Sequence, residues 1–192
     1  MSPPAIRLAT PDDAPRLHAL LHAAYAEAAA EGAHFTVTRA GVETVRERIT
    51  RHTTFVAEQT TADGTPELLA TVSVRFPWVP GEKHHASYPF IHWFATHPGH
   101  KRRGLGAQLL DHAEHHFLRD QIKAPAVYLA TATRHPWLVG LYAGRGYQPF
   151  GHTVNPLGTA LVWMRKILVP ALYEALPAPR ESVTAAEAPP QP

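Results

Sequence analysis

The stretch His97-Pro98-Gly99-His100-Lys101-Arg102-Arg103-Gly104-Leu105-Gly106-Ala107 decides the fold, because it joins an extended run to the start of a helix. Glycines at a helix start let a ligand approach the backbone N–H groups, since they carry no side chain. Those N–H groups and the helix dipole favour an anion, and the three basic residues before Gly104 add positive charge. The stretch therefore predicts a phosphate or pyrophosphate site.

Two common phosphate-binding motifs do not fit this stretch. A P-loop needs Gly-Lys-Ser/Thr at a fixed spacing, and a dinucleotide fingerprint needs a third glycine, which would fall at Leu109. A glycine-rich turn beside a solvated basic patch is the alternative explanation of the stretch taken alone.

Outward from this stretch, hydrophobic periodicity predicts an α/β chain in the order βααβββαβαββ, with one mixed sheet. The expected strands are 5–8, 53–59, 68–76, 87–97, 127–132, 147–154 and 159–167, and the expected helices are 11–31, 39–51, 105–117 and 135–143. Residues 1–169 form the predicted domain. Residues 170–192 hold six of the chain's 19 prolines and predict a Pro/Ala-rich tail, with a short helix at 170–176 and disorder beyond Pro177.

Composition excludes several classes of function. The chain has no cysteine, so disulfide scaffolds, thiolate metal sites and cysteine nucleophiles are excluded. The formal net charge of +2 is too small for a chain that binds nucleic acid or an anionic membrane with its whole surface. Because we find neither a signal-peptide pattern nor a long apolar run, we expect a soluble, cytoplasmic protein with no nucleic-acid or membrane partner.

Two motifs together resemble the GCN5-related N-acetyltransferase (GNAT) family. The acyl-CoA signature of the family is Gln/Arg-x-x-Gly-x-Gly/Ala, and here it reads Lys101-Arg-Arg-Gly104-Leu-Gly106. The second block of the family, Leu-Tyr followed by Gly-Phe/Tyr, reads Leu141-Tyr142-Ala-Gly-Arg-Gly146-Tyr147. The resemblance covers roughly residues 4–168. It implies a mixed, mostly antiparallel sheet of about seven strands, flanked by about four helices, with the fourth and fifth strands splayed apart.

The resemblance also implies acetyl-CoA as co-substrate, with its pantetheine arm lying in the gap between the splayed strands. His135 stands where the family often has an asparagine that contacts this arm, which puts that contact in doubt. The implied cofactor-binding residues are Phe94, Ala95, Thr96, Lys101, Arg102, Arg103, Gly104, Leu105, Gly106, Ala107 and His135.

The resemblance implies that Tyr142 is the general acid that protonates the departing sulfur. A tyrosine packed against the cofactor for shape is the alternative. The carboxylate bases of some relatives are replaced here by Phe90 and Ala130, whereas His92 matches a strand histidine that other relatives use as, or near, the base. An imidazole can accept a proton near neutral pH. A strand histidine satisfied by its neighbours is the alternative for His92.

The remaining histidines do not predict a metal. The i,i+4 histidine pairs, His18 and His22 and His112 and His116, lack ordered carboxylate partners, and His115 lies beside the second pair, so we expect solvated helix faces.

The sequence therefore predicts an acetyl-CoA-dependent N-acetyltransferase that acts on a primary amine by direct attack in a ternary complex. A non-catalytic acyl-CoA sensor is the alternative. The acceptor is a small-molecule amine or a peptide N-terminus, selected by the loops 31–38 and 152–158. The chain is expected to be a monomer or a homodimer. Candidate acceptor contacts are His34, Phe35 and His152, with an aromatic wall of Trp78, Tyr88, Phe90 and Trp137.

Overall fold

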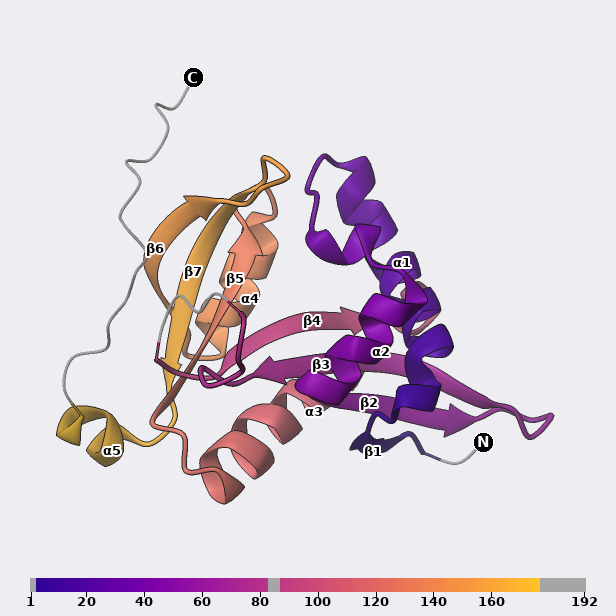
Figure 1. Cartoon of the computed structure of the whole chain (residues 1–192), viewed down its shortest axis with the longest axis horizontal. Coiled ribbons are helices and arrows are strands. Elements are labelled where there is room, and N and C mark those ends of the chain that lie inside the picture. Colours follow the sequence, from indigo (N-terminus) through magenta and orange to yellow (C-terminus); the bar gives the residue numbers. More distant parts are fainter. Residues whose placement is uncertain (1–2, 83–86, 177–192) are drawn as a thin grey trace.

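The computed structural model describes residues 3–82 and 87–176, and within these residues seven strands form one sheet in the order β1-β2-β3-β4-β5-β7-β6 (Figure 1). Neighbouring strands are antiparallel, except that β4 and β5 run parallel. The mixed, mostly antiparallel sheet is confirmed. The strands are β1 Ala5–Leu8, β2 Thr53–Thr60, β3 Pro66–Arg75, β4 Phe90–Thr96, β5 Ala126–Ala132, β6 Gln148–Val154 and β7 Ala160–Ile167.

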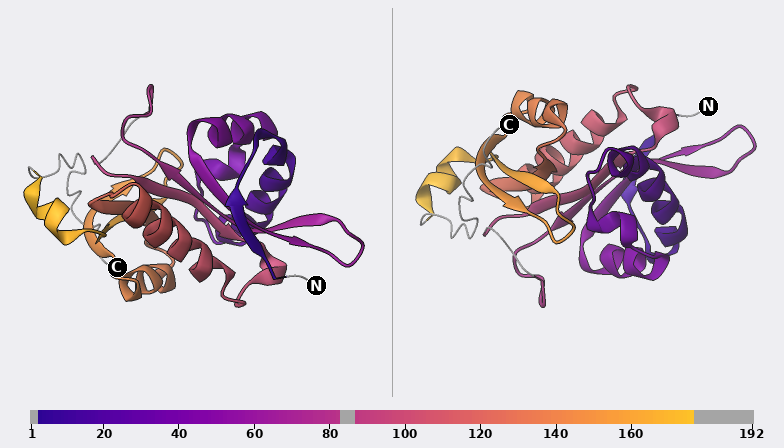
Figure 2. Two further views of the ribbon diagram at one scale, coloured as in Figure 1. Left: turned by 90° about the horizontal axis from the view of Figure 1, so that it is seen from below. Right: turned by 90° about the horizontal axis from the view of Figure 1, so that it is seen from above.

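Helices cover both faces of the sheet. The helices are α1 Ala14–Ala30, α2 Val42–Arg51, α3 Leu105–Asp111 with its π-helical continuation His112–Gln121, α4 Pro136–Gly144 and α5 Pro170–Ala175. Figure 2 shows α1 and α2 on the face opposite α3. Leu17, Leu21 and Val45 are buried in the core under α1 and α2, whereas Leu109, Leu110 and Tyr142 are buried in the core under α3 and α4.

The element order matches the predicted order, with two differences. Strand β4 begins at Phe90 rather than near residue 87, and the helix after Gly104 becomes a π-helix at His112. The tail expected to be disordered beyond Pro177 lies outside the described residues. Among the described residues, no helix is both long and apolar enough to cross a membrane.

Strand β4 departs from regular pairing on both of its edges. The register between β3 and β4 shifts between Thr71 and Ser73, and Trp93 adopts a positive φ of 49°, which is uncommon for a non-glycine residue. In the described part of the chain only Phe90 and Ile91 pair with β5. The expected splay of the fourth and fifth strands is confirmed, and it leaves one edge of β4 facing a gap.

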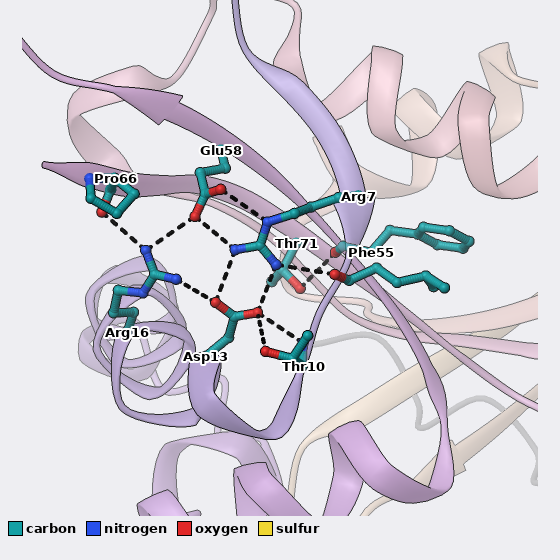
Figure 3. A network of polar contacts seen from close by, with 9 residues as sticks. Arg7, Thr10, Asp13, Arg16, Phe55, Glu58, Pro66 and Thr71 are labelled. Atoms are coloured by element: carbon teal, nitrogen blue, oxygen red, sulfur yellow. Dashed lines mark hydrogen bonds and ion pairs between the residues drawn. The ribbon is translucent and has the colours of Figure 1, made fainter. Parts of the chain in front are cut away.

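An ion-pair network fixes the start of the chain to the sheet (Figure 3). Arg7 on β1 forms hydrogen bonds with Asp13, which precedes α1, at 2.7 and 2.9 Å and with Glu58 on β2 at 2.9 and 2.7 Å. Arg16 in α1 reaches both carboxylates, at 2.5 and 3.0 Å. The network therefore holds the first strand, the first helix and the second strand in one arrangement.

Candidate active site

A cavity of about 1020 Å³ lies between the splayed strands and the surrounding helices. Of the residues that the sequence assigns to catalysis or cofactor binding, it is lined by His92, Phe94, Ala95, Thr96, Lys101, Arg102, Gly104, Leu105, Gly106, Ala107, His135 and Tyr142. The exception is Arg103, which is not a lining residue and instead contacts His100 at 2.8 Å. The fold thus brings almost the whole predicted set together.

The glycine-rich turn presents backbone donors at one end of this cavity. Arg102 and Gly104 have positive φ angles of 63° and 78°, and the N–H of Gln108 makes the first helical bond, to the carbonyl of Gly104 at 3.0 Å. The N–H groups of residues 105–107 precede that bond, so they are the donors that a helix N-terminus offers to an anion. Lys101 beside them forms an ion pair with Glu27 of α1 at 2.5 Å.

Gly106 allows helix α3 to lie close against strand β4. A Cβ atom at this position would lie 3.1 Å from Cζ of Phe94 and 3.3 Å from Oγ1 of Thr96. These distances are shorter than most carbon contacts, so a side chain here would push the turn away from the strand.

His135 lies at the N-terminal end of α4 and faces the cavity. Its Nδ1 atom lies 3.2 Å from Glu31, and only 9% of its side chain is exposed. Its Nε2 atom is buried and has no hydrogen-bond partner among the described residues. A buried nitrogen without a partner is costly, so Nε2 of His135 has hydrogen-bonding capacity that the described residues do not use.

Tyr142 projects from α4 and is buried at the cavity wall. Its ring centroid lies 5.7 Å from that of Tyr147, whose hydroxyl donates to the buried carboxylate of Glu114 at 2.9 Å. Burial raises the pKa of Tyr142 above its usual range. The phenol therefore keeps its proton at neutral pH.

His92 heads a chain of three polar side chains. Its Nε2 lies 2.9 Å from Nδ1 of His52, and Nε2 of His52 lies 2.9 Å from the carboxylate of Glu82. Because the carboxylate only accepts, Nε2–H of His52 donates to Glu82, so Nδ1 of a neutral His52 accepts from Nε2–H of His92. The lone pair of His92 then resides on Nδ1, and this tautomer leaves that atom free to act as a base.

Burial and neighbouring positive charges keep both imidazoles neutral. Burial lowers the pKa of His92 well below its usual range, and the positive charges of Arg75 and Arg48 lower it further. Burial also lowers the pKa of His52, against the opposing effect of Glu82. At Glu82, burial alone would raise the pKa, but the interactions with His52, Arg75 and Arg48 outweigh it and lower the pKa to about 2.

The predicted acceptor loops meet at the same cavity. Thr159 Oγ1 accepts from the backbone N–H of His34 at 2.8 Å, and Asn155 Nδ2 donates to the carbonyl of His34 at 2.8 Å. Phe35 and Asn155 line the cavity, whereas His34 and His152 are not lining residues.

The predicted aromatic wall is half right. Phe90 and Trp137 line the cavity. Trp78, 68% exposed, stacks on Phe76 instead, and Tyr88 is buried in a separate cluster. Trp163 from β7, which the sequence did not single out, lines the cavity in addition.

Sequence reasoning also missed His52, Glu82, Arg48 and Arg75. His52 follows α2, Glu82 lies in the loop after β3, and no local motif links them. The pairing of β2 with β3 and of β3 with β4 brings them together, which spacing in one sequence does not reveal. No group of three or more His, Cys, Asp or Glu side chains among the described residues could hold a metal ion.

A sheet opened between two parallel strands, with a helix N-terminus at the opening, is the architecture that the resemblance implies for acyl-CoA-dependent transferases. A model of the Acetyltransferase (GNAT) family matches residues 17–147, and the chain belongs to this family.

Similar proteins support this assignment. An S-alkylcysteine N-acetyltransferase of Bacillus subtilis (strain 168) is 39% identical over 174 residues, which cover 90% of this chain and 94% of that protein. An S-(2-succino)cysteine N-acetyltransferase of the same strain is 35% identical over 167 residues, which cover 86% of this chain and 96% of that protein. The fold resembles the crystal structure of the ribosomal-protein-S18-alanine N-acetyltransferase of Escherichia coli, with a TM-score of 0.65 and 14% sequence identity. The superposition covers 86% of this chain and 94% of that chain. The chain is therefore an enzyme, an N-acetyltransferase, rather than a non-catalytic sensor.

Proposed function

We propose that this enzyme transfers the acetyl group of acetyl-CoA to the α-amino group of an S-substituted cysteine, by direct attack in a ternary complex. One observation carries the proposal: a single cavity extends from the anion-binding turn at Gly104, along the free edge of β4, to His92. The two curated relatives act on S-substituted cysteines, and these supply the acceptor class.

The residues present fit a bound acetyl-CoA. The N-terminal amides of α3 and the basic side chains of Lys101 and Arg102 suit its phosphates. The edge of β4 at Phe94–Thr96, which pairs with no residue of β5, suits the amide groups of the pantetheine arm, and the buried Nε2 of His135 suits a polar atom of the same arm. When bound, acetyl-CoA supplies a thioester carbonyl that an amine can attack.

His92 and Tyr142 then divide the proton transfers. The amine nitrogen becomes far more acidic as its bond to the carbonyl carbon forms, so a weakly basic His92 suffices to take its proton. His52 and Glu82 hold His92 in the tautomer that leaves Nδ1 free. Tyr142 donates its proton to the sulfur as the carbon–sulfur bond breaks, which yields the amide and free CoA thiol.

Release of CoA thiol tests the proposal. The purified enzyme receives acetyl-CoA with S-methylcysteine, S-(2-succino)cysteine, spermidine or a peptide with a free N-terminal alanine. We expect multiple turnovers on the cysteine derivatives, with kcat/KM about 100-fold or more above that for the other two, a difference that one or two charged contacts supply. A preference for spermidine or the peptide would overturn the proposed acceptor.

We also propose a cytoplasmic location, on the sequence grounds given above.

A further inference from the structure

The acceptor end of the cavity carries an excess of positive charge. Glu82 forms ion pairs with three arginines, Arg48 at 2.7 Å, Arg75 at 3.1 Å and Arg51 at 3.6 Å. Arg48 and Arg75 line the cavity, but Glu82 is not a lining residue. Two arginines therefore line the ligand space, and one carboxylate outside the lining balances only part of their charge.

The carboxylates that line the cavity do not cancel this charge. Among the described lining residues they are Glu27 and Glu31, both on or just after α1. Glu27 pairs with Lys101 at 2.5 Å, and Glu31 lies 3.2 Å from His135. Both belong to the cofactor side, so the site around His92 favours an anionic acceptor.

Arg75 has a buried donor to spare. It forms a hydrogen bond with Glu82 through Nη1, yet its Nε is buried with no hydrogen-bond partner among the described residues. Its guanidinium carbon lies 5.0 Å from the ring centroid of Phe90. A carboxylate binds a guanidinium group in its plane, along the N–H edge, and the ring over one face leaves this edge uncovered.

The register of the sheet places Arg75 close to the base. Arg75 lies opposite Phe90, and Ser73 lies opposite His92, so Arg75 and His92 are two positions apart on neighbouring strands. In an α-amino acid, one carbon atom separates the carboxylate from the amine. A carboxylate held by Arg75 thus brings the amine of the same molecule near His92.

We infer that Arg75, supported by Arg48, binds the α-carboxylate of the acceptor and so restricts the enzyme to α-amino acids rather than simple amines. The inference rests on the proposed function and deepens it, because it names the group that selects the substrate. Glu82 then has two tasks: it orients His52, and it fixes both arginines along the cavity wall.

The test compares two acceptors that differ only in the carboxylate, S-methylcysteine and 2-(methylthio)ethylamine. We expect the wild-type enzyme to prefer S-methylcysteine by 100-fold or more in kcat/KM. Arg75→Gln should lower kcat/KM for S-methylcysteine by about 10- to 100-fold, since one charge-assisted contact is lost, and should narrow the preference for S-methylcysteine over the amine. Arg75→Lys should retain part of the preference.

Arg51→Gln is the matched control, because Arg51 approaches the same Glu82 but does not line the cavity. It should leave the preference unchanged. Binding of acetyl-CoA by calorimetry shows whether each variant is folded. If Arg75→Gln does not fold, Arg48→Gln and the wild-type preference between the two acceptors test the inference instead. Equal turnover of the two acceptors by the wild-type enzyme would overturn this inference alone. Turnover confined to spermidine or the peptide would overturn the proposed function as well.

Discussion

Tyr142 is buried at the cavity wall, and burial keeps its phenol protonated. If it protonates the departing sulfur, Tyr142→Phe should lower kcat by about 100-fold or more, because general acids contribute on that scale. The dissociation constant of acetyl-CoA, measured by calorimetry, should change less than threefold, since the ring still fills the wall. A similar loss in kcat and in acetyl-CoA affinity would instead indicate that Tyr142 acts by shape.

Tyr147→Phe is the control for this change. Tyr147 is also buried, but its hydroxyl donates to Glu114 rather than facing the cavity. Its removal should lower the unfolding midpoint in urea and leave kcat unchanged.

The surroundings of His92 predict the acid side of the pH profile. A base works in its deprotonated form, and the burial of His92 together with the charges of Arg75 and Arg48 lowers its pKa well below 6.5. With saturating substrates, kcat should therefore fall with decreasing pH only below pH 6.5. His92→Gln should lower kcat by about 100-fold or more and remove this fall. A wild-type fall centred at or above pH 6.5, or an unchanged kcat in His92→Gln, would contradict the role.

At the scale of elements, the contact between α3 and β4 sets the position of the N-terminal amides of α3, which are proposed to bind the phosphates of acetyl-CoA. In Gly106→Ala, the new Cβ would press on Phe94 and Thr96 and shift the helix start. We expect KM for acetyl-CoA to rise about tenfold, which corresponds to about 1.4 kcal/mol of binding free energy. Steady-state kinetics with varied acetyl-CoA measures this effect.

Gly140→Ala in α4 is the matched control, because nothing lies within 4 Å of the added Cβ. Alanine in a helix interior should raise the free energy of unfolding by about 0.5–1 kcal/mol and leave KM unchanged. An equal rise in KM in both variants would show that the effect does not arise at the β4 contact.

These elements show which features a single sequence reveals. Periodicity located the helices, because the burial of Leu105 and Leu109 or of Leu17 and Leu21 repeats with the helical period. The glycine-rich turn before α3 was also predictable, since its glycines and basic residues are consecutive. The burial of Glu114 was not predictable from the sequence. Glu114 is fully buried, and its partners Lys166 and Arg145, at 2.5 and 3.1 Å, come from other elements.

At the scale of the whole molecule, the active site depends on contacts between distant segments. His52 and His92 are 40 positions apart in the sequence, and His34 and Thr159 are 125 apart. The first pair forms the polar chain of the candidate base, and the second joins the acceptor loops across the splayed sheet. Because no periodicity encodes such pairs, the resemblance could name His92 but not the residues that orient it.

An ion-pair network also links distant segments, and it consists of Arg7, Asp13, Arg16 and Glu58 (Figure 3). It makes the free energy of unfolding depend on pH in the acid range. The hydrogen bond from Arg7 lowers the pKa of Asp13, although burial opposes it. Only 2% of the Asp13 side chain is exposed, whereas its arginine partners are about one-third exposed and can regain water. Asp13→Asn should therefore lower the free energy of unfolding by about 2–3 kcal/mol at pH 7, measured by urea denaturation.

The sign of the pH dependence follows from the lowered pKa of Asp13. A carboxyl that is more acidic in the folded state stabilises the fold above its unfolded pKa of about 3.9, and this contribution is lost as pH falls through the folded pKa. The wild-type protein should therefore lose more stability than Asp13→Asn between pH 5 and pH 2. Asp12→Asn, at the exposed neighbouring position, should follow the wild-type curve. If Asp13→Asn and the wild-type protein lose stability in parallel, the network contributes nothing through the charge of Asp13.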